Sequence, residues 1–516
     1  MNNLLWAALI ALLYPIYLLL QVGKRHPRMP PGPPTVPILG NAHQIPLTGL
    51  GKRFAEWSKQ YGSVFSLKIG PTNVVVLCDR KSVAQLLDKK GSIYSDRPLA
   101  RVTQFITRGD HLTLEAQGPS WRMKRSVVTN HFNPKQLDDK HWKVQEAEAV
   151  VFMNNLLRQP EKIFDFAKLY TASVATTLIY GQRAASLDSF WNKDVYILMD
   201  HWVVAEEPGA NPPVDEFPLL WYWPGNWKTR AYKTRALMDS TWSKARSIVE
   251  ERRAKGNKRD CLIDAKLDEY NAKGFPMSQH AFTNLFGELV EAGSDTTANS
   301  ILTMIFSLAK YPWVQEKARV EIDKKECDGA QRMSPPFSNP ILWCDTNASY
   351  SASAGLPHKV TQDDEYEGMF IPKGSTVFAG IWAMHQNETL YPNHDTFNPD
   401  RYLNHPKLAN DYAVGSDYMN RDHYGYGTGR RMCPGIHLAE RSMWRIAAKL
   451  LWAFDISEPL DPVTGEVIPL DPEAFSSAIL LAPKPFQVRI VPRSDKHLAA
   501  IERELAGSLD FLSQWE

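Results

Sequence analysis

The most reactive side chain that the sequence offers is a cysteine in a glycine-rich stretch. Residues 426–435 read YGTGRRMCPG, and an amphipathic segment, IHLAERSMWRIAAKLLWAF, follows directly. Glycines on both sides of Cys433 let the backbone fold closely around its sulfur, and the N–H groups that begin the next helix stabilise a thiolate. A thiolate held in this way can serve as the proximal ligand of a haem iron. The alternative is a buried, inert cysteine that precedes a helix.

A second group of polar residues interrupts a long apolar helix. The spacing of apolar residues predicts a helix over residues 278–310, with Ser278 as a good N-cap. Residues 292–297, in its middle, read AGSDTT. Glycine inside a helix costs about 1 kcal/mol relative to alanine, so Gly293 indicates the close approach of a ligand. The acidic and hydroxyl side chains that follow are also unfavourable there unless they are used locally or by a substrate. The alternative is a polar patch that faces other helices.

A third motif pairs an aromatic residue with a basic one. Residues 121–125 read WRMKR. Positions four residues apart share one face of a helix, so Trp121 and Arg125 can reach the same partner. The alternative is a basic helix on the surface of the protein.

Together these stretches resemble the motifs of the cytochrome P450 family. The family's haem-binding loop has the pattern F-x-x-G-x-R-x-C-x-G, which Gly429, Arg431, Cys433 and Gly435 match, with Tyr426 in the place of the phenylalanine. The resemblance implies that Cys433 is the axial ligand of haem b. It also implies that Arg431 contacts a haem propionate.

The other two motifs are similar to further family segments. The AGSDTT stretch resembles the oxygen-activating segment, which implies that Thr296 holds bound dioxygen and its water while Asp295 relays protons to the distal oxygen. The family's W-x-x-x-R helix implies that Trp121 and Arg125 contact a propionate. His358, in LPHKV, stands where the family often has a propionate-contacting arginine or histidine, and it is the remaining candidate.

The sequence departs from the family where a helix with the pattern E-x-x-R is expected. In the family, that Glu and Arg form a buried network with an arginine matched here by Arg401 of FNPDRY. The stretch in the expected place, residues 339–354, reads NPILWCDTNASYSASA and holds neither Glu nor Arg. Two pairs with the right spacing lie too early in the chain and are not assigned to this role: Glu250 with Arg253 and Glu316 with Arg319.

The missing pair has a physical consequence. Arg401 would be a charge without its partner, which costs several kcal/mol if the side chain stays buried. One explanation is that residues 338–355 reflect a misread exon boundary or a frameshift. The other is that the chain is a crippled or haem-free relative. The abrupt return to family-like sequence at Gly355 favours the first explanation.

The first forty residues predict an attachment to a membrane. Residues 4–22 are apolar except for one glutamine, and as a helix they would be about 28 Å long, close to the thickness of a bilayer core. Basic residues follow and place the rest of the chain in the cytoplasm. We therefore assign residues 1–23 to a transmembrane anchor in the endoplasmic reticulum and residues 24–41 to a basic, proline-rich strut. The alternative is a cleaved signal peptide.

The body of the chain reads as mainly α with a smaller β part, which is the fold class that the P450 resemblance implies. Residues 42–494 form the expected haem-thiolate domain, with long helical patterns between about 120 and 325. Residues 495–516 form an extension without an assignable role. Strand-like segments are short and few: 64–69, 73–78, 359–380 and 475–492.

Composition excludes several classes of protein. Hydrophobic residues make up 44% and charged residues 22% of the 516 positions, which is typical of a globular protein rather than a disordered one. The net charge of +2 argues against nucleic-acid binding through bulk positive charge. Five cysteines are too few, and odd in number, for a disulfide scaffold, which favours a reducing compartment.

The resemblance implies a monooxygenase that inserts one atom of dioxygen into an apolar small molecule. Its electrons would come from an NADPH–cytochrome P450 reductase on the same membrane. The loop sequences are most similar to fungal secondary-metabolite members. Two alternatives remain: a haem-dependent isomerase or dehydratase, and an inactive or misannotated P450-like protein. The segments expected to line the substrate pocket are 99–118, 196–222, 286–297 and 475–481.

Overall fold

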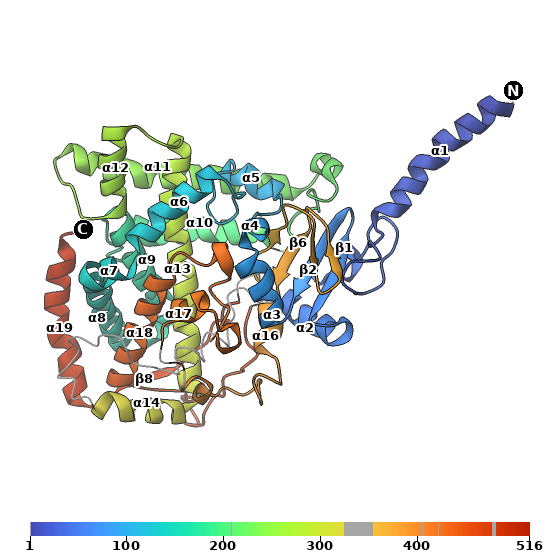
Figure 1. Ribbon diagram of the computed structural model, residues 1–516. Helices are drawn as coiled ribbons and strands as arrows, with labels where there is room; N and C mark the ends of the chain where they lie inside the picture. Colours follow the sequence, from blue (N-terminus) through green and yellow to red (C-terminus); the bar gives the residue numbers. More distant parts are fainter. Residues whose placement is uncertain are drawn as a thin grey trace.

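Helices form most of the protein, and short strands form a smaller part beside them (Figure 1). The computed structural model describes residues 2–207, 209–324, 354–403, 405, 407–421, 423–476 and 481–516. The predicted fold class, mainly α with a smaller β part, is confirmed. The helices are α1 (Asn2–Val22), α2 (Leu50–Tyr61), α3 (Arg80–Val83), α4 (Gly91–Tyr94), α5 (Arg101–Thr107), α6 (Pro119–His131), α7 (Pro134–Gln136), α8 (Trp142–Arg158), α9 (Ile163–Tyr180), α10 (Phe190–Glu206), α11 (Asn226–Ala254), α12 (Leu262–Lys273), α13 (Gln279–Lys310), α14 (Pro312–Lys324), α16 (Ile381–His385), α17 (Ala409–Val414), α18 (Ile436–Ala453) and α19 (Asp495–Ser513).

Helix α13 runs through the middle of the helical part, as the sequence predicts (Figure 1). The Ser278 hydroxyl caps it by accepting a hydrogen bond from the Ala281 N–H at 3.0 Å. Most of its side chains are buried, because it packs against α9, α11 and α18. A helix covered on several sides needs apolar residues around most of its circumference, which is what its sequence supplies.

The strands form one four-stranded sheet and two strand pairs among the described residues. They are β1 (Val64–Ile69), β2 (Thr72–Leu77), β3 (His358–Lys359), β4 (Asp364–Tyr366), β5 (Met369–Ile371), β6 (Thr376–Ala379), β7 (Phe454–Ser457) and β8 (Arg489–Pro492).

The larger sheet has the order β1-β2-β6-β3. Strands β1 and β2 form the antiparallel hairpin that the Gly70-Pro71 signal predicts, with Ile69 paired to Thr72. Strand β6 lies parallel to β2, and β3 pairs with β6 and so places His358 in the sheet. The predicted strand over 475–492 is mostly irregular: of its described residues, only the last four form a strand, β8.

The C-terminal segment, for which the sequence indicated no role, is packed onto the body. Helix α19 lies against α8 and α18, with Ile501 and Leu512 buried (Figure 1). The backbone N–H of Arg183 donates to the carbonyl oxygen of Trp515 at 2.9 Å. The segment therefore contributes to the core around α8.

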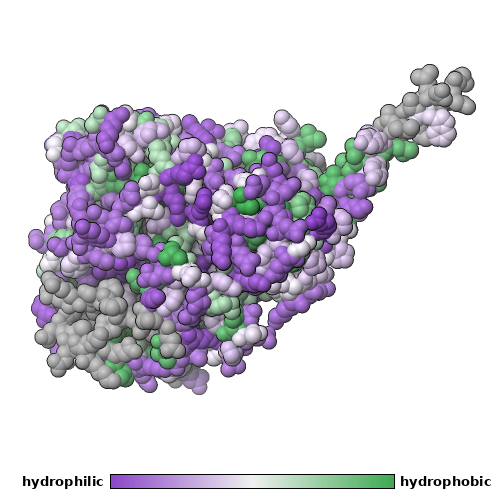
Figure 2. Space-filling model, viewed as in Figure 1, coloured by the Kyte–Doolittle hydropathy of each residue, from purple (hydrophilic) through white to green (hydrophobic). Residues whose placement is uncertain are grey.

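At the other end of the chain, α1 projects away from the body (Figure 1). Within the described part of the chain, no helix has the length and apolarity needed to cross a membrane, so the predicted transmembrane helix is not confirmed. The proline-rich strut is fixed to the body, since the Ser66 N–H donates to the Pro31 carbonyl oxygen at 2.7 Å. Figure 2 shows apolar side chains where α1 meets the body, on an otherwise mostly hydrophilic face. Val36, Ile38 and Leu39, which follow α1 in the chain, are exposed.

Candidate haem-thiolate site

Cys433 lies in a tight loop immediately before α18. The Cys433 N–H donates to the Tyr426 carbonyl oxygen at 2.8 Å, which closes the loop on itself. Gly429 has a φ of 58° and sits against the backbone of Leu87, where any Cβ would collide with the carbonyl oxygen. The Gly429 N–H also donates to Asp88 Oδ1 at 2.7 Å. Glycine is thus required at this position by both conformation and space.

Burial raises the pKa of the Cys433 thiol. Three groups act in the opposite direction and favour the thiolate. They are the backbone N–H groups of Gly435 and Ile436, at the start of α18, and the positive charge of Arg125. The arrangement is the one that the glycine-rich loop predicts, in which helix N–H groups surround the sulfur.

Arg431 is buried beside this loop, and its partners among the described residues are backbone oxygens and an aromatic ring. Its Nε donates to the Ser95 carbonyl at 2.7 Å, and its Nη2 donates to the Glu115 carbonyl at 2.8 Å. A longer bond of 3.5 Å joins Nη1 to the Leu112 carbonyl. The guanidinium carbon lies 4.1 Å from the centre of the Trp121 ring. Burial, the leading cause, lowers the pKa of Arg431 to about 10.

Trp121 and Arg125 reach the same place from α6. Arg125 donates through Nη2 to the carbonyl oxygen of Met432, next to the cysteine, and its guanidinium carbon lies 5.8 Å from the Trp121 ring centre. Trp121 and Lys124 are both buried, so α6 is not a basic surface helix. The i, i+4 spacing places both side chains beside the Cys433 loop, and their contact with a haem propionate stays a prediction.

Arg97 is a third arginine at the site, and the sequence analysis missed it. Its Nε donates to the Thr113 carbonyl at 2.9 Å, and its Nη1 donates to the Leu356 carbonyl at 3.3 Å. Burial, followed by the charges of Arg431 and Arg125, lowers its pKa to about 9. No spacing rule connects Arg97 to the cysteine loop, so only the fold reveals it.

His358 lies in the sheet next to these arginines. Its Nδ1 is 2.7 Å from the Tyr94 carbonyl oxygen, which acts as the acceptor. Burial, and then the charges of Arg97 and Arg431, lower the pKa of His358 to about 3. The imidazole is therefore neutral at neutral pH, and it adds no positive charge to the site.

The three arginines, Arg97, Arg125 and Arg431, form a cradle of positive charge beside the Cys433 loop. Among the described residues, no carboxylate lies within ion-pair distance of any of them, although buried arginines are normally paired with acids. A cofactor that carries a soft metal ion and two carboxylates would match both the Cys433 thiolate and the three arginines. Haem has this chemistry, so the residues fit the cofactor.

Comparison with known proteins decides the family. A family model described as cytochrome P450 matches residues 30–341 and 348–490. The chain belongs to the cytochrome P450 family. The match breaks at residues 342–347, inside the stretch that lacks the E-x-x-R pattern.

Fungal P450 enzymes are similar over nearly the whole chain. The cytochrome P450 monooxygenase patI of Aspergillus clavatus is 39% identical and the alignment covers 98% of this chain and 96% of that protein. The cytochrome P450 monooxygenase acuD of Aspergillus aculeatus is 38% identical, with 99% and 97% covered. By family, the chain is a cytochrome P450 monooxygenase of the kind found in fungal secondary metabolism.

A solved structure has the same fold. A zebra fish cytochrome P450, in a structure with abiraterone, is 20% identical with a TM-score of 0.68, and the match covers 86% of this chain and 100% of that one.

Helix α13 presents one open face in this P450. Ala292 is exposed although it lies in the middle of a helix with mostly buried side chains, and Gly293 and Thr296 are partly exposed. A Cβ on Gly293 would meet only the Ala175 Cβ, at 3.7 Å, so protein packing does not require glycine there. The Thr296 hydroxyl donates to the Ala292 carbonyl at 2.7 Å. The ligand approach expected at Gly293 stays a prediction.

Asp295 points to a different side of α13 from Thr296. Its Oδ2 accepts a hydrogen bond from Asn299 Nδ2 at 3.2 Å. Burial raises the pKa of Asp295, while the charge of Lys168 on α9 lowers it and that of Asp200 on α10 raises it. The two adjacent residues therefore have different hydrogen-bond partners. Their roles with dioxygen stay predictions.

Arg401 lies in a short turn of helix over Pro399–Tyr402. Its Nη2 donates to the Asn393 carbonyl oxygen, and its guanidinium carbon lies 6.0 Å from the Tyr391 ring centre. Its Nε is buried and has no hydrogen-bond partner among the described residues. No acid among the described residues forms an ion pair with it.

The predicted gap in the E-x-x-R region, residues 339–354, lies outside the described residues except for its last position. The two pairs that were not assigned to this role are engaged elsewhere. Arg253 pairs with Asp264 at 3.0 Å, and Arg319 pairs with Asp455 at 2.7 Å. In the described part of the chain, no hydrogen bond or ion pair joins either pair to Arg401.

Proposed function

We propose that this P450 monooxygenase oxidises an apolar small molecule in a fungal secondary-metabolite pathway and that Cys433 ligates the iron of haem b. The observation that carries the proposal is the partly buried thiol of Cys433 beside the three-arginine cradle, which has no acid within ion-pair distance among the described residues. The related monooxygenases from Aspergillus species support the pathway class.

The proposed roles in holding the cofactor follow from charge and position. When bound, haem supplies the activation of dioxygen. Arg97, Arg125 and Arg431 bind its propionates, and the Trp121 ring helps to hold the guanidinium groups of Arg125 and Arg431, which lie 5.8 and 4.1 Å from its centre. Neutral His358 is a hydrogen-bonding neighbour of this cradle.

Two residues of α13 are proposed to manage protons. The Thr296 hydroxyl already donates to the Ala292 carbonyl, so its oxygen can accept a hydrogen bond from a water or ligand on the open face of the helix. Asp295, whose pKa is raised by burial, can carry a proton closer to neutral pH than an exposed aspartate. Thr296 would orient the proton donor and Asp295 would resupply it.

We also propose that an NADPH–cytochrome P450 reductase supplies the electrons and that α1 attaches the chain to the endoplasmic reticulum membrane. The support for attachment is the set of exposed apolar side chains on α1, such as Trp6, Leu13 and Tyr17. The full chain is expected to sediment with microsomes, and a chain that starts at residue 24 is expected to sediment less. Equal sedimentation of both would contradict attachment through α1.

The reduced, carbon-monoxide difference spectrum of the full chain tests the enzyme. We expect a thiolate-type band for the wild-type chain and none for Cys433→Ser. Turnover that requires NADPH and the reductase then separates oxygen insertion from the haem-dependent isomerase or dehydratase alternative. A wild-type chain that binds no haem would overturn the proposal and favour the inactive alternative.

A further inference from the structure

We propose that Glu288 of α13 is a positioning residue for the cofactor cradle. It holds the loop between α5 and α6, residues 108–118, so that the backbone carbonyls of this loop orient Arg97 and Arg431 toward the haem propionates. This inference rests on the proposed function, because it concerns arginines assigned to haem.

The Glu288 carboxylate accepts three hydrogen bonds from two consecutive residues of the loop. The N–H of Leu112 donates to Oε2 at 2.6 Å, while the N–H and the hydroxyl of Thr113 donate to Oε1, each at 2.8 Å. His111 Nδ1 lies 3.0 Å from Oε1. The Glu288 side chain is only 6% exposed, so these bonds are shielded from water. Hydrogen bonds to a buried carboxylate are among the stronger ones in proteins.

The same two residues bind the arginines through their carbonyl oxygens. Thr113 accepts from Arg97 at 2.9 Å, and Leu112 accepts from Arg431 at 3.5 Å. The Leu112 carbonyl and the Thr113 N–H belong to one planar peptide unit and point in opposite directions. When Glu288 fixes the N–H side of this unit, it also fixes the direction in which the carbonyl meets Arg431.

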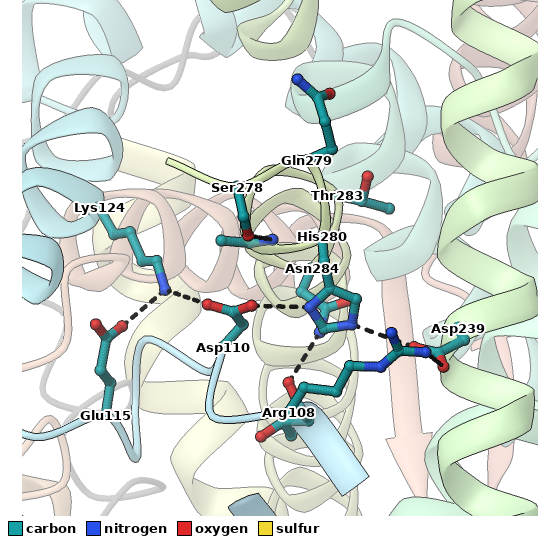
Figure 3. Close-up of polar contacts among 12 residues, drawn as sticks. Arg108, Asp110, Glu115, Lys124, Asp239, Ser278, Gln279, His280, Thr283 and Asn284 are labelled. Atoms are coloured by element: carbon teal, nitrogen blue, oxygen red, sulfur yellow. Dashed lines mark hydrogen bonds and ion pairs between the residues drawn. The ribbon is translucent and has the colours of Figure 1, made fainter. Parts of the chain in front are cut away.

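A separate network holds the loop by its side chains (Figure 3). Lys124 lies 2.8 Å from Glu115 and 3.3 Å from Asp110, and Asp110 lies 2.8 Å from the His280 ring. These contacts hold Asp110 and Glu115 of the 108–118 loop but do not include the N–H groups of Leu112 and Thr113. Among the described residues, these two N–H groups bind Glu288 alone.

Helix α13 also offers a matched control. Glu291 lies one turn further along, is equally buried, and accepts a hydrogen bond from Trp242 Nε1 at 2.9 Å. It has no hydrogen bond to the 108–118 loop in the described part of the chain. A glutamine at position 291 keeps an acceptor for Trp242. A glutamine at position 288 instead turns an NH₂ group toward one of the two loop N–H groups, so one bond is lost.

The experiment compares the full-length wild-type chain with Glu288→Gln and Glu291→Gln. One readout is the rate of haem transfer to apomyoglobin, and the other is hydrogen exchange of the 112–113 amides in the haem-free chain. For Glu288→Gln we expect both rates to rise about 10- to 100-fold, the range for loss of a hydrogen bond to a charged group. For Glu291→Gln we expect changes below about 2-fold.

Two further results separate the possible failures. If Glu288→Gln does not fold, Thr113→Val, which removes only the hydroxyl bond to Glu288, should raise both rates to a smaller extent. Unchanged rates in Thr113→Val, or equal rates in Glu288→Gln and Glu291→Gln, would overturn the positioning role while a haem-bound wild-type chain keeps the proposed function. A wild-type chain that retains no haem would overturn both.

Discussion

Two arginines of this P450, Arg431 and Arg401, differ in how completely their N–H donors are hydrogen-bonded. Arg431, beside Cys433, donates to three backbone carbonyls and lies over the face of Trp121. Arg401 donates to one carbonyl and lies 6.0 Å from the Tyr391 ring centre, and in the described part of the chain its buried Nε has no hydrogen-bond partner. Neither has an acidic partner among the described residues, yet only Arg431 has its donors arranged in advance.

The difference shows how a protein can hold positive charge in two distinct ways. In the cradle, carbonyl oxygens take up the N–H donors without neutralising the charge, so the charge stays available for an external anion. At Arg401, the family pattern supplies an internal acid, and this sequence lacks the E-x-x-R motif that would carry it. An unsatisfied buried donor costs about 1 to 3 kcal/mol, so the first site is prepared for a ligand and the second is a local weakness.

The largest effect is expected when the sulfur of Cys433, beside the cradle, is removed. Cys433→Ala should abolish the thiolate-type band completely, because no other described residue offers a thiolate next to the cradle arginines. The measurement is the reduced, carbon-monoxide difference spectrum. A retained band would place the ligand elsewhere and remove the reason for comparing the two sites.

A second test removes Arg431, the arginine whose donors are hydrogen-bonded. Arg431→Ala should lower haem affinity about 100-fold, since a charged group with several hydrogen bonds is lost and the Trp121 face is exposed. Titration of haem into the haem-free protein measures the change. Arg401→Ala is the control, for which we expect less than about a 5-fold change. Similar losses in both variants would mean that the two arginines contribute equally to haem binding.

A third test uses the lowered pKa of His358, which burial and then the charges of the cradle cause. Its pKa in the folded chain, about 3, lies below the ordinary value of 6.5. The unfolded chain therefore binds a proton between these two values while the folded chain does not. The stability that neutral His358 contributes is complete above pH 6.5 and is lost as the pH falls toward 3.

The size of this effect can be measured against a variant that does not titrate. Between pH 6.5 and 5.5, the wild-type chain should lose about 1 kcal/mol of unfolding free energy relative to His358→Gln. Urea unfolding at a series of pH values gives both numbers. Parallel stability curves for the two proteins would show that burial and the positive charges of Arg97 and Arg431 do not lower the pKa of His358.

The smallest effect is expected at Arg401, whose Nε has no hydrogen-bond partner among the described residues. Arg401→Met should change the free energy of unfolding by less than about 1 kcal/mol, because the gain from removing an unpaired buried donor offsets the loss of the hydrogen bond to the Asn393 carbonyl. Urea unfolding of both proteins at neutral pH is the measurement. A loss of 3 to 5 kcal/mol would reveal a buried acidic partner of Arg401 and would make the two sites alike.

The sequence by itself determined the parts of this protein that rest on local patterns. The capped helix at residues 278–310, the glycine-rich turn before α18, and the shared face of Trp121 and Arg125 follow from dihedral preferences and helix periodicity. Each involves residues within a few positions of one another, so residue type and spacing are sufficient to predict them.

Only the tertiary structure decided how these parts are held together. Arg97 and Arg431 bind backbone carbonyls, which every residue has, so no residue type in the sequence marks their acceptors. Glu288 reads as one more polar residue of α13 until the fold brings it to the loop N–H groups. The packing of α19 is equally a matter of contacts between distant segments. Neighbouring residues determine local geometry, whereas the tertiary fold determines the partners of buried polar groups.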